Sequence, residues 1–127
     1  MSAATELTFR YDSGCLIATA TGRYVIEHKE AAVRSVAAAI KAQPVRAALI
    51  DMRGLKPPYG FLDRYQLGEL AGRYLTAVPV AILLTEALTD PDHFGKVVAN
   101  NRGARVEVFT HEAQACAWLK QHQIPAA

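Results

Sequence analysis

Three side chains in this sequence have types suited to charge and proton chemistry: Asp51, Arg53 and His111. Each comes at the predicted exit of a strand, and ligands tend to gather beyond the carboxyl ends of parallel strands. A carboxylate beside a guanidinium binds charged groups through paired hydrogen bonds, and an imidazole beside an acid can move a proton. One interpretation is therefore a small enzyme with a polar site made by these three residues.

The interpretation that we favour is structural. Asp51 and Arg53 would then brace the loops after a strand, and His111 would stand in the first turn of a helix. We therefore assign no catalytic residue, and the small enzyme stays the alternative to a non-enzymatic module.

Other chemistries lack the spacing that they require. The histidines include no pair with metal-ligand spacing, and the cysteines, Cys15 and Cys116, stand far apart. The sequence has no glycine-rich phosphate-binding motif and no nucleophile elbow. We expect no metal and no cofactor, and two reduced thiols that act as small hydrophobic side chains.

Length and charge narrow the class of protein. The 127 residues fit one domain over 1–127, and the net charge of +2 comes from scattered basic residues, so no nucleic-acid partner is expected. The apolar runs are shorter than the roughly 20 residues that a membrane-spanning helix needs, so no membrane partner is expected either. The first residues do not resemble a secretory signal, which predicts a cytoplasmic location.

Hydropathy patterns predict the elements that must position these residues. Asp12-Ser13-Gly14 predicts the turn of a hairpin, and later apolar runs without alternation are typical of parallel strands covered on both faces. Asp90-Pro91-Asp92 is expected to start a helix, and Thr110 to cap the last one. The predicted strands cover about 7–11, 15–21, 47–50, 80–84 and 106–109, and the predicted helices cover 27–42, 61–75, 90–101 and a segment after 110. The order ββαβαβαβα predicts an α/β domain with a mixed, mostly parallel five-stranded sheet.

This pattern resembles a known bacterial family. The strand order, the segment Asp51-Met52-Arg53-Gly54-Leu55 and a closing segment over 102–113 followed by Trp118-Leu119 resemble STAS-like, or SpoIIAA-like, proteins, the relatives of the anti-sigma-factor antagonist. The resemblance implies a stack of βα units and a regulatory or binding role rather than a known reaction. We therefore expect a non-enzymatic regulatory or scaffolding module that acts through protein contact or a small apolar ligand. Lipid carriage, also seen with this family, would need a larger cavity than 127 residues are expected to enclose.

One feature of the signalling members of that family is missing. They carry a phosphorylatable serine just after the third strand, whereas this chain has no serine or threonine between Ser35 and Thr76. Tyr59 is the only hydroxyl in the corresponding loop, and it sits on a longer side chain. The usual phosphoserine switch is therefore not expected.

The helix predicted over 61–75 has two apolar stripes. Gly68 and Gly72 each cost about 1 kcal/mol relative to alanine in a helix, so a neighbour must pack close to the backbone there. The stripe that holds these glycines, together with Phe61 and Tyr65, has two interpretations. It either faces the chain's own sheet and neighbouring helix, or it forms a contact surface for a second subunit, a partner protein or a small apolar ligand. The predicted binding residues are Asp51, Arg53, Pro57, Pro58, Tyr59, Phe61, Tyr65, Gly68 and Gly72.

Self-association is a further expectation. If all helices lie on one side of the sheet, the apolar third and fourth strands leave the other side uncovered. Residues of the first strand, the N-terminal segment or a symmetric partner could cover it, and a two-fold homodimer is the commonest closed solution.

Overall fold

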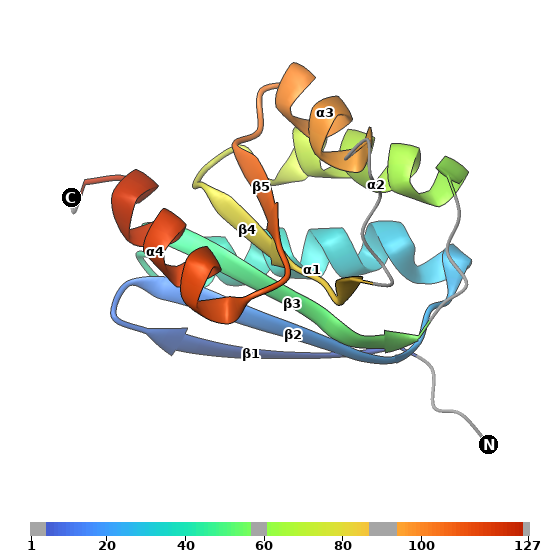
Figure 1. Ribbon diagram of the computed structural model, residues 1–127, viewed down its shortest axis with the longest axis horizontal. Coiled ribbons are helices and arrows are strands. Elements are labelled where there is room, and N and C mark those ends of the chain that lie inside the picture. The colour runs from blue at the N-terminus through green and yellow to red at the C-terminus, as the bar shows by residue number, and fades with distance from the viewer. Residues whose placement is uncertain (1–4, 57–60, 87–93, 126–127) are drawn as a thin grey trace.

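The computed structural model describes residues 5–56, 61–86 and 94–125. Within them the chain alternates strands and helices in the predicted order (Figure 1). The elements are β1 (Glu6–Asp12), β2 (Cys15–Arg23), a 3₁₀ helix (Ile26–His28), α1 (Lys29–Ala42), β3 (Ala47–Lys56), α2 (Phe61–Tyr74), β4 (Val80–Leu83), α3 (Phe94–Asn101), β5 (Val106–Phe109) and α4 (Glu112–His122).

The strands lie side by side in the order β1-β2-β3-β4-β5 (Figure 1). β1 and β2 are antiparallel, and the three later pairs are parallel. Ser13 and Gly14 join β1 to β2 with φ angles of 51° and 80°, the positive values that a two-residue hairpin turn of type I′ needs. The predicted fold class, an α/β domain with a mixed and mostly parallel five-stranded sheet, is confirmed.

Helices α1, α2 and α3 lie on one face of the sheet. Leu16, Ala48 and Val80 point from three strands to this side, where they share one buried cluster with Val36 of α1 and Ala99 of α3. α2 packs against α3 and α1, so it lies over the sheet as the outer part of this layer. Because α2 packs mainly on the other two helices, a space remains between it and the sheet.

Helix α4 covers the other face, in front of the strands in Figure 1. Ala115 and Leu119 of α4 are buried against Leu49 of β3 and Leu83 of β4. The prediction that this face lacks a cover is wrong, because the chain returns across the sheet after β5. The argument for a homodimer that rested on an open face is therefore removed.

One local expectation, the cap of the last helix, differs from the structure. The N-cap of α4 is His111, without a side-chain capping bond, because the Thr110 hydroxyl lies 3.1 Å from His111 Nδ1 instead. The prediction that Thr110 caps this helix is wrong. The expected helix start at Asp90-Pro91-Asp92 lies outside the described residues.

The apolar side chains of strand β1 are more exposed to solvent than their alternating pattern predicts. Phe9 and Tyr11 are 38% and 36% exposed, since β1 is the edge of the sheet and α1 reaches it only in part. The Tyr11 hydroxyl donates to the Ala39 carbonyl at 2.8 Å. No helix in the described part of the chain is long and apolar enough to span a membrane.

Candidate functional site

The two predicted rim residues, Asp51 and Arg53, form a bidentate pair at the carboxyl half of β3. Arg53 Nε donates to Asp51 Oδ1 at 3.1 Å and Arg53 Nη2 donates to Oδ2 at 2.9 Å. The register of β2 and β3 shifts beside them, between Thr19 and Thr21, and there the Arg53 backbone N–H also donates to Asp51 Oδ1. Arg53 reaches on to Glu112 in the first turn of α4 at 3.1 Å. The pair therefore braces β3 to α4.

His111, the third rim residue, does not join this pair. Its ring bonds to Thr110, and among the described residues no hydrogen bond or ion pair links it to Asp51 or Arg53. The hydrogen bonds from Arg53 lower the pKa of the Asp51 carboxyl below 3.8, so this carboxyl is a weaker base than an ordinary aspartate. The geometry supports the structural interpretation of the rim.

The two glycines of α2 pack against α3 of the same chain. A Cβ at Gly68 would stand 2.6 Å from the carbonyl oxygen of Gly95, and a Cβ at Gly72 would stand 2.4 Å from Arg102 Cβ. The alternative that these glycines meet a second subunit is therefore wrong, because α3 already occupies the space. Gly68 nevertheless lines a cavity that opens to the surface, so the small-ligand alternative remains for it.

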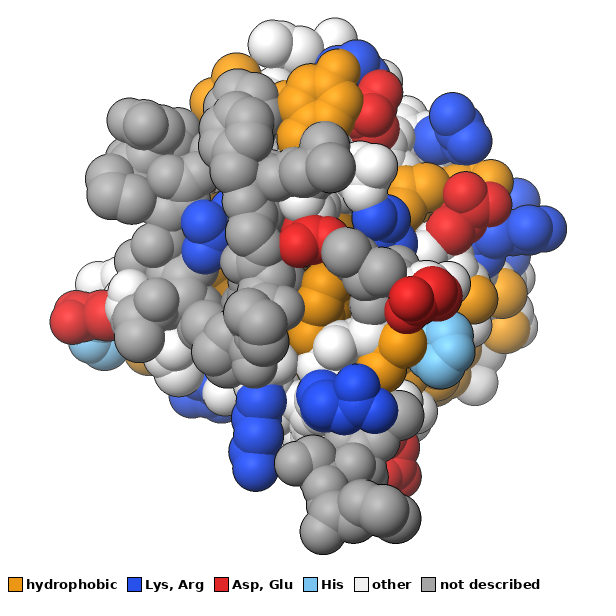
Figure 2. All heavy atoms as spheres, turned by 90° about the vertical axis from the view of Figure 1, so that its right-hand side faces the viewer, with side chains coloured by type: hydrophobic (Ala, Val, Ile, Leu, Met, Phe, Trp, Pro, Cys, Tyr) orange, Lys and Arg blue, Asp and Glu red, His pale blue; other side chains and the backbone are white. Residues whose placement is uncertain are grey.

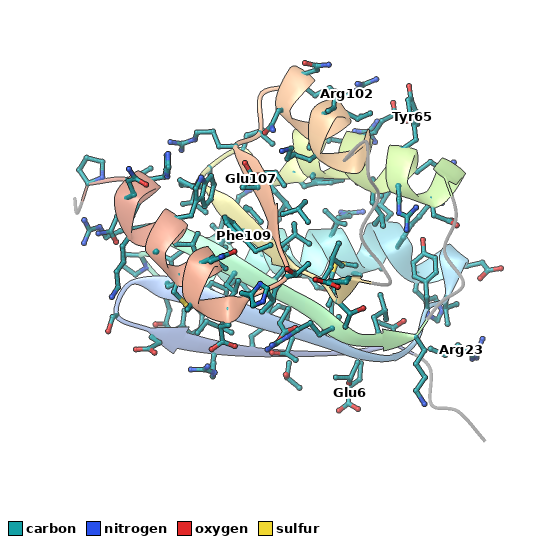
Figure 3. All side chains as sticks on the ribbon, viewed as in Figure 1. Glu6, Arg23, Tyr65, Arg102, Glu107 and Phe109 are labelled. Carbon is teal, nitrogen blue, oxygen red and sulfur yellow. The ribbon has the colours of Figure 1, made fainter. Side chains whose placement is uncertain are left out.

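The outer end of the same stripe is polar. Arg102 Nη2 lies 3.4 Å from the Tyr65 hydroxyl and 3.2 Å from Glu69 Oε2, and its guanidinium stands over the Tyr65 ring, 5.8 Å from the centroid. Figure 3 shows Tyr65 and Arg102 approaching each other from α2 and α3. Pro57, Pro58 and Tyr59 lie outside the described residues, as does the side chain of Phe61.

A cavity of ≈ 200 Å³ lies between the sheet and the layer of α1, α2 and α3. Its walls are mainly aliphatic, with side chains from all five strands or their ends and from the three helices. They include Leu7, Val36, Ile50, Leu67, Leu75 and Val106. α2 packs against α3 and α1 more than against the sheet, and the cavity lies on the side of α2 that faces the strands.

The polar lining residues gather at one end of the cavity. α1, α2 and α3 begin where β2, β3 and β4 have ended, so in a parallel sheet their first turns meet at the carboxyl edge. His28, Lys29, Arg64 and Lys96 line the cavity from these first turns, and Tyr24 follows β2. Figure 2 shows this face, with hydrophobic side chains at its centre between charged ones. The cavity therefore has a polar mouth and an apolar interior.

A buried polar cluster stands at this mouth. Asp63 in the first turn of α2 is 8% exposed. The Tyr24 hydroxyl donates to Asp63 Oδ1 at 3.3 Å, and Lys29 Nζ lies 3.9 Å from the same oxygen. Lys29 also donates to Gln66 Oε1. This cluster joins the end of β2 to the starts of α1 and α2.

Sequence reasoning missed these four residues. The contacts that Asp63 and Gln66 of α2 make with Tyr24 and Lys29 join residues 34 to 39 positions apart in the chain. The only local signal was Asp63 in the first turn of a predicted helix, where acidic residues are common for helix-dipole reasons.

The thiols lie on the α4 side of the sheet. Cys15 and Cys116 are half-buried and free, and burial raises the pKa of the Cys15 thiol above 9.0. Both facts fit the expectation of small hydrophobic side chains. Within residues 5–56, 61–86 and 94–125, no three His, Cys, Asp or Glu side chains cluster as a metal site would require.

Comparison with known proteins adds a relationship of fold. No protein-family model matches the chain, and no curated protein matches it. An anti-sigma factor antagonist from Mycobacterium paratuberculosis matches 91% of this chain and 94% of its own, with a TM-score of 0.65 and 9% identity. An uncharacterized DUF3478 protein from Shewanella loihica matches 94% of this chain and 95% of its own, with a TM-score of 0.54 and 20% identity. That protein is described as having a SpoIIAA-like fold. Likeness at such low identity establishes architecture, and this chain accordingly has the SpoIIAA-like fold.

Proposed function

We propose that this protein is a non-enzymatic regulatory module that works by binding, and that its ligand is a small apolar molecule held in the cavity between the sheet and α1, α2 and α3. The observation that carries the proposal is the cavity itself. Ligand sites in proteins are concave and mostly apolar, with a few polar groups that orient the ligand, and this aliphatic space of ≈ 200 Å³ with basic side chains in its lining has that character.

The volume sets the size of the ligand. Pockets for drug-sized molecules measure roughly 300–1,000 Å³, whereas an apolar cavity of about 150 Å³ accommodates benzene. A space of ≈ 200 Å³ lies between these values. It suits a ligand a little larger than benzene and is too small for a whole lipid.

The regulatory part of the proposal draws on the fold relatives. A protein that shares this fold is an anti-sigma factor antagonist, which supports a role through contact with a partner protein. The region after β3 lacks serine and threonine, so the proposal uses ligand occupancy in place of serine phosphorylation. The rim of Asp51, Arg53 and His111 has no part in it.

Self-association and a cytoplasmic location stay predictions. Among the described residues, Phe9 and Tyr11 of β1 are large hydrophobic side chains that are exposed. They supply an apolar surface against which a second copy of the chain could pack. Light scattering of the purified protein would measure the mass directly, and a monomer at every concentration would contradict the homodimer.

Toluene, a small apolar probe, tests the cavity directly. Ala71 of α2 lines the cavity, so Ala71→Leu would fill part of it. Ala38→Leu makes the same change at an exposed position of α1 and is the matched control. We expect calorimetry to detect toluene binding to the native protein and to Ala38→Leu, with a loss of at least about tenfold in Ala71→Leu. No binding to the native protein, or equal binding to both variants, would contradict the proposal.

A further inference from the structure

We infer that the natural occupant of the cavity is an aliphatic carboxylate with roughly eight carbon atoms, bound with its carboxylate toward Lys29 and its chain toward Leu75. This inference rests on the proposed function, since it names the ligand class of the same cavity. Three observations carry it: the sign of the charges in the lining, the free donor capacity of Lys29 and the aliphatic inner walls.

Every ionisable group in the described lining is either basic or a tyrosine. His28, Lys29, Arg64 and Lys96 line the cavity together with Tyr24, and no carboxylate does. The carboxylates of Asp63 and Glu107 stand behind two of these bases as salt-bridge partners. The first turns of three helices also meet at this end, and their partial positive charge favours an anion. A negatively charged head group therefore fits the mouth better than a positive one.

Lys29 is the base best placed to meet that head group. Its side chain is 18% exposed, so a contact there is partly shielded from water. An ammonium has three donors. Gln66 accepts one of them, while Asp63 Oδ1 at 3.9 Å is an ion pair beyond hydrogen-bond distance. Donor capacity therefore remains for a carboxylate of a ligand.

The interior suits a saturated chain. Beyond the mouth the walls are built from aliphatic side chains such as Val36, Ile50, Leu75 and Val80. The aromatic rings among the described lining residues, those of Tyr24 and His28, belong to the mouth. A flat aromatic ligand would have no ring to stack on along these inner walls. If a cavity of about 150 Å³ holds the six carbons of benzene, one of ≈ 200 Å³ holds roughly eight.

The head group is tested on the native protein with octanoate, octanol and octylamine, compared by calorimetry at neutral pH. We expect octanoate to bind about tenfold more tightly than octanol, because a hydrogen bond to a charged group is stronger than one to a hydroxyl. Octylamine should bind most weakly. Equal affinity for octanoate and octanol, or a preference for octylamine, would overturn the inference while leaving toluene binding and the proposed function intact. If neither toluene nor any eight-carbon compound binds, both proposals are wrong.

A pair of variants tests the role of Lys29. Lys29→Gln removes the charge at the mouth, and Lys41→Gln makes the same change at an exposed position in the last turn of α1. We expect Lys29→Gln to bind octanoate no better than octanol, with octanol affinity unchanged, and Lys41→Gln to keep the native preference. A preference for octanoate that survives in Lys29→Gln would contradict this placement of the carboxylate. Should Lys29→Gln fail to fold, the head-group series on the native protein still decides the inference.

Discussion

Gly68 of α2 faces the backbone of Gly95 in α3 so closely that a Cβ at position 68 would lie 2.6 Å from the Gly95 carbonyl oxygen. Real Cβ atoms essentially never approach a backbone oxygen to that distance. Gly68 and Gly95 allow α2 and α3 to pack closely. The space between α2 and the sheet is the cavity that the proposed function uses. The glycines of α2 thus serve the packing of one chain rather than a contact between two.

Gly68→Ala is expected to destabilise the protein. Alanine is favoured over glycine in a helix by about 1 kcal/mol, but overpacking against α3 typically costs about 1–3 kcal/mol, so urea unfolding should show a net loss. Ala38→Gly, at an exposed site of α1, calibrates the propensity difference alone. If Gly68→Ala stabilised the protein by that calibrated amount, the close helix contact would be disproved.

Asp51 is expected to make stability depend on acidity. Its pKa is lowered by the Arg53 hydrogen bonds below 3.8, so the stabilisation is fully present above that ordinary value and is lost as the pH falls through the lower folded value. Asp51→Asn should therefore cost about 1 kcal/mol near pH 7, with the difference from the native protein shrinking as the pH falls below 3.8.

The exposed partner of the same guanidinium gives the control for this pH dependence. Glu112, whose side chain is 57% exposed, should show a smaller effect as Glu112→Gln, because solvent screens the pair. A cost for Asp51→Asn that stays constant from neutral to acidic pH would contradict the assignment.

Asp63→Asn is expected to be strongly destabilising. Asp63 is buried against Lys29 and Tyr24, and losing the charge from a hydrogen-bonded buried carboxylate costs about 1.5–3 kcal/mol. Asp12→Asn is the matched control, because Asp12 pairs with Arg10 at 3.8 Å with both side chains over 60% exposed. That change should cost less than about 1 kcal/mol. Similar free energies of unfolding for the two variants would show that the cluster of Tyr24, Lys29 and Asp63 does not stabilise the fold.

Leu119→Ala tests whether α4 is the cover of its face of the sheet. Leu119 is 5% exposed and packs with Ala115 against the strands, so its truncation should cost about 2–5 kcal/mol. Lys120→Ala, at the exposed neighbouring position, should change stability by less than about 0.5 kcal/mol. Trp118 is the only tryptophan and lies 5.9 Å from the Phe109 ring, so its fluorescence follows the docking of α4. Native stability in Leu119→Ala would contradict this packing.

The element order was accessible from the sequence because its signals are local. The period-two pattern of β1 and the Ser13-Gly14 turn predict a hairpin from adjacent residues, and the apolar run before Asp51 predicts a buried strand. The bidentate contact of Asp51 with Arg53 is also local, as the two residues are two positions apart. Local signals failed at the helix cap, where the Thr110 hydroxyl has a competing partner in His111.

The sequence alone therefore determined the α/β class, the order of strands and helices, and the glycine spacing that requires a close neighbour. Only the tertiary structure decided that α3 is that neighbour, that α4 covers the far face, and that Tyr24, Lys29 and Asp63 meet at the mouth of a cavity. The physical reason is the distance along the chain over which each kind of interaction acts. Periodicity and turn chemistry act over a few residues, whereas a cavity and its polar mouth arise from how helices distant in the chain pack over one sheet, which no short stretch of residues records.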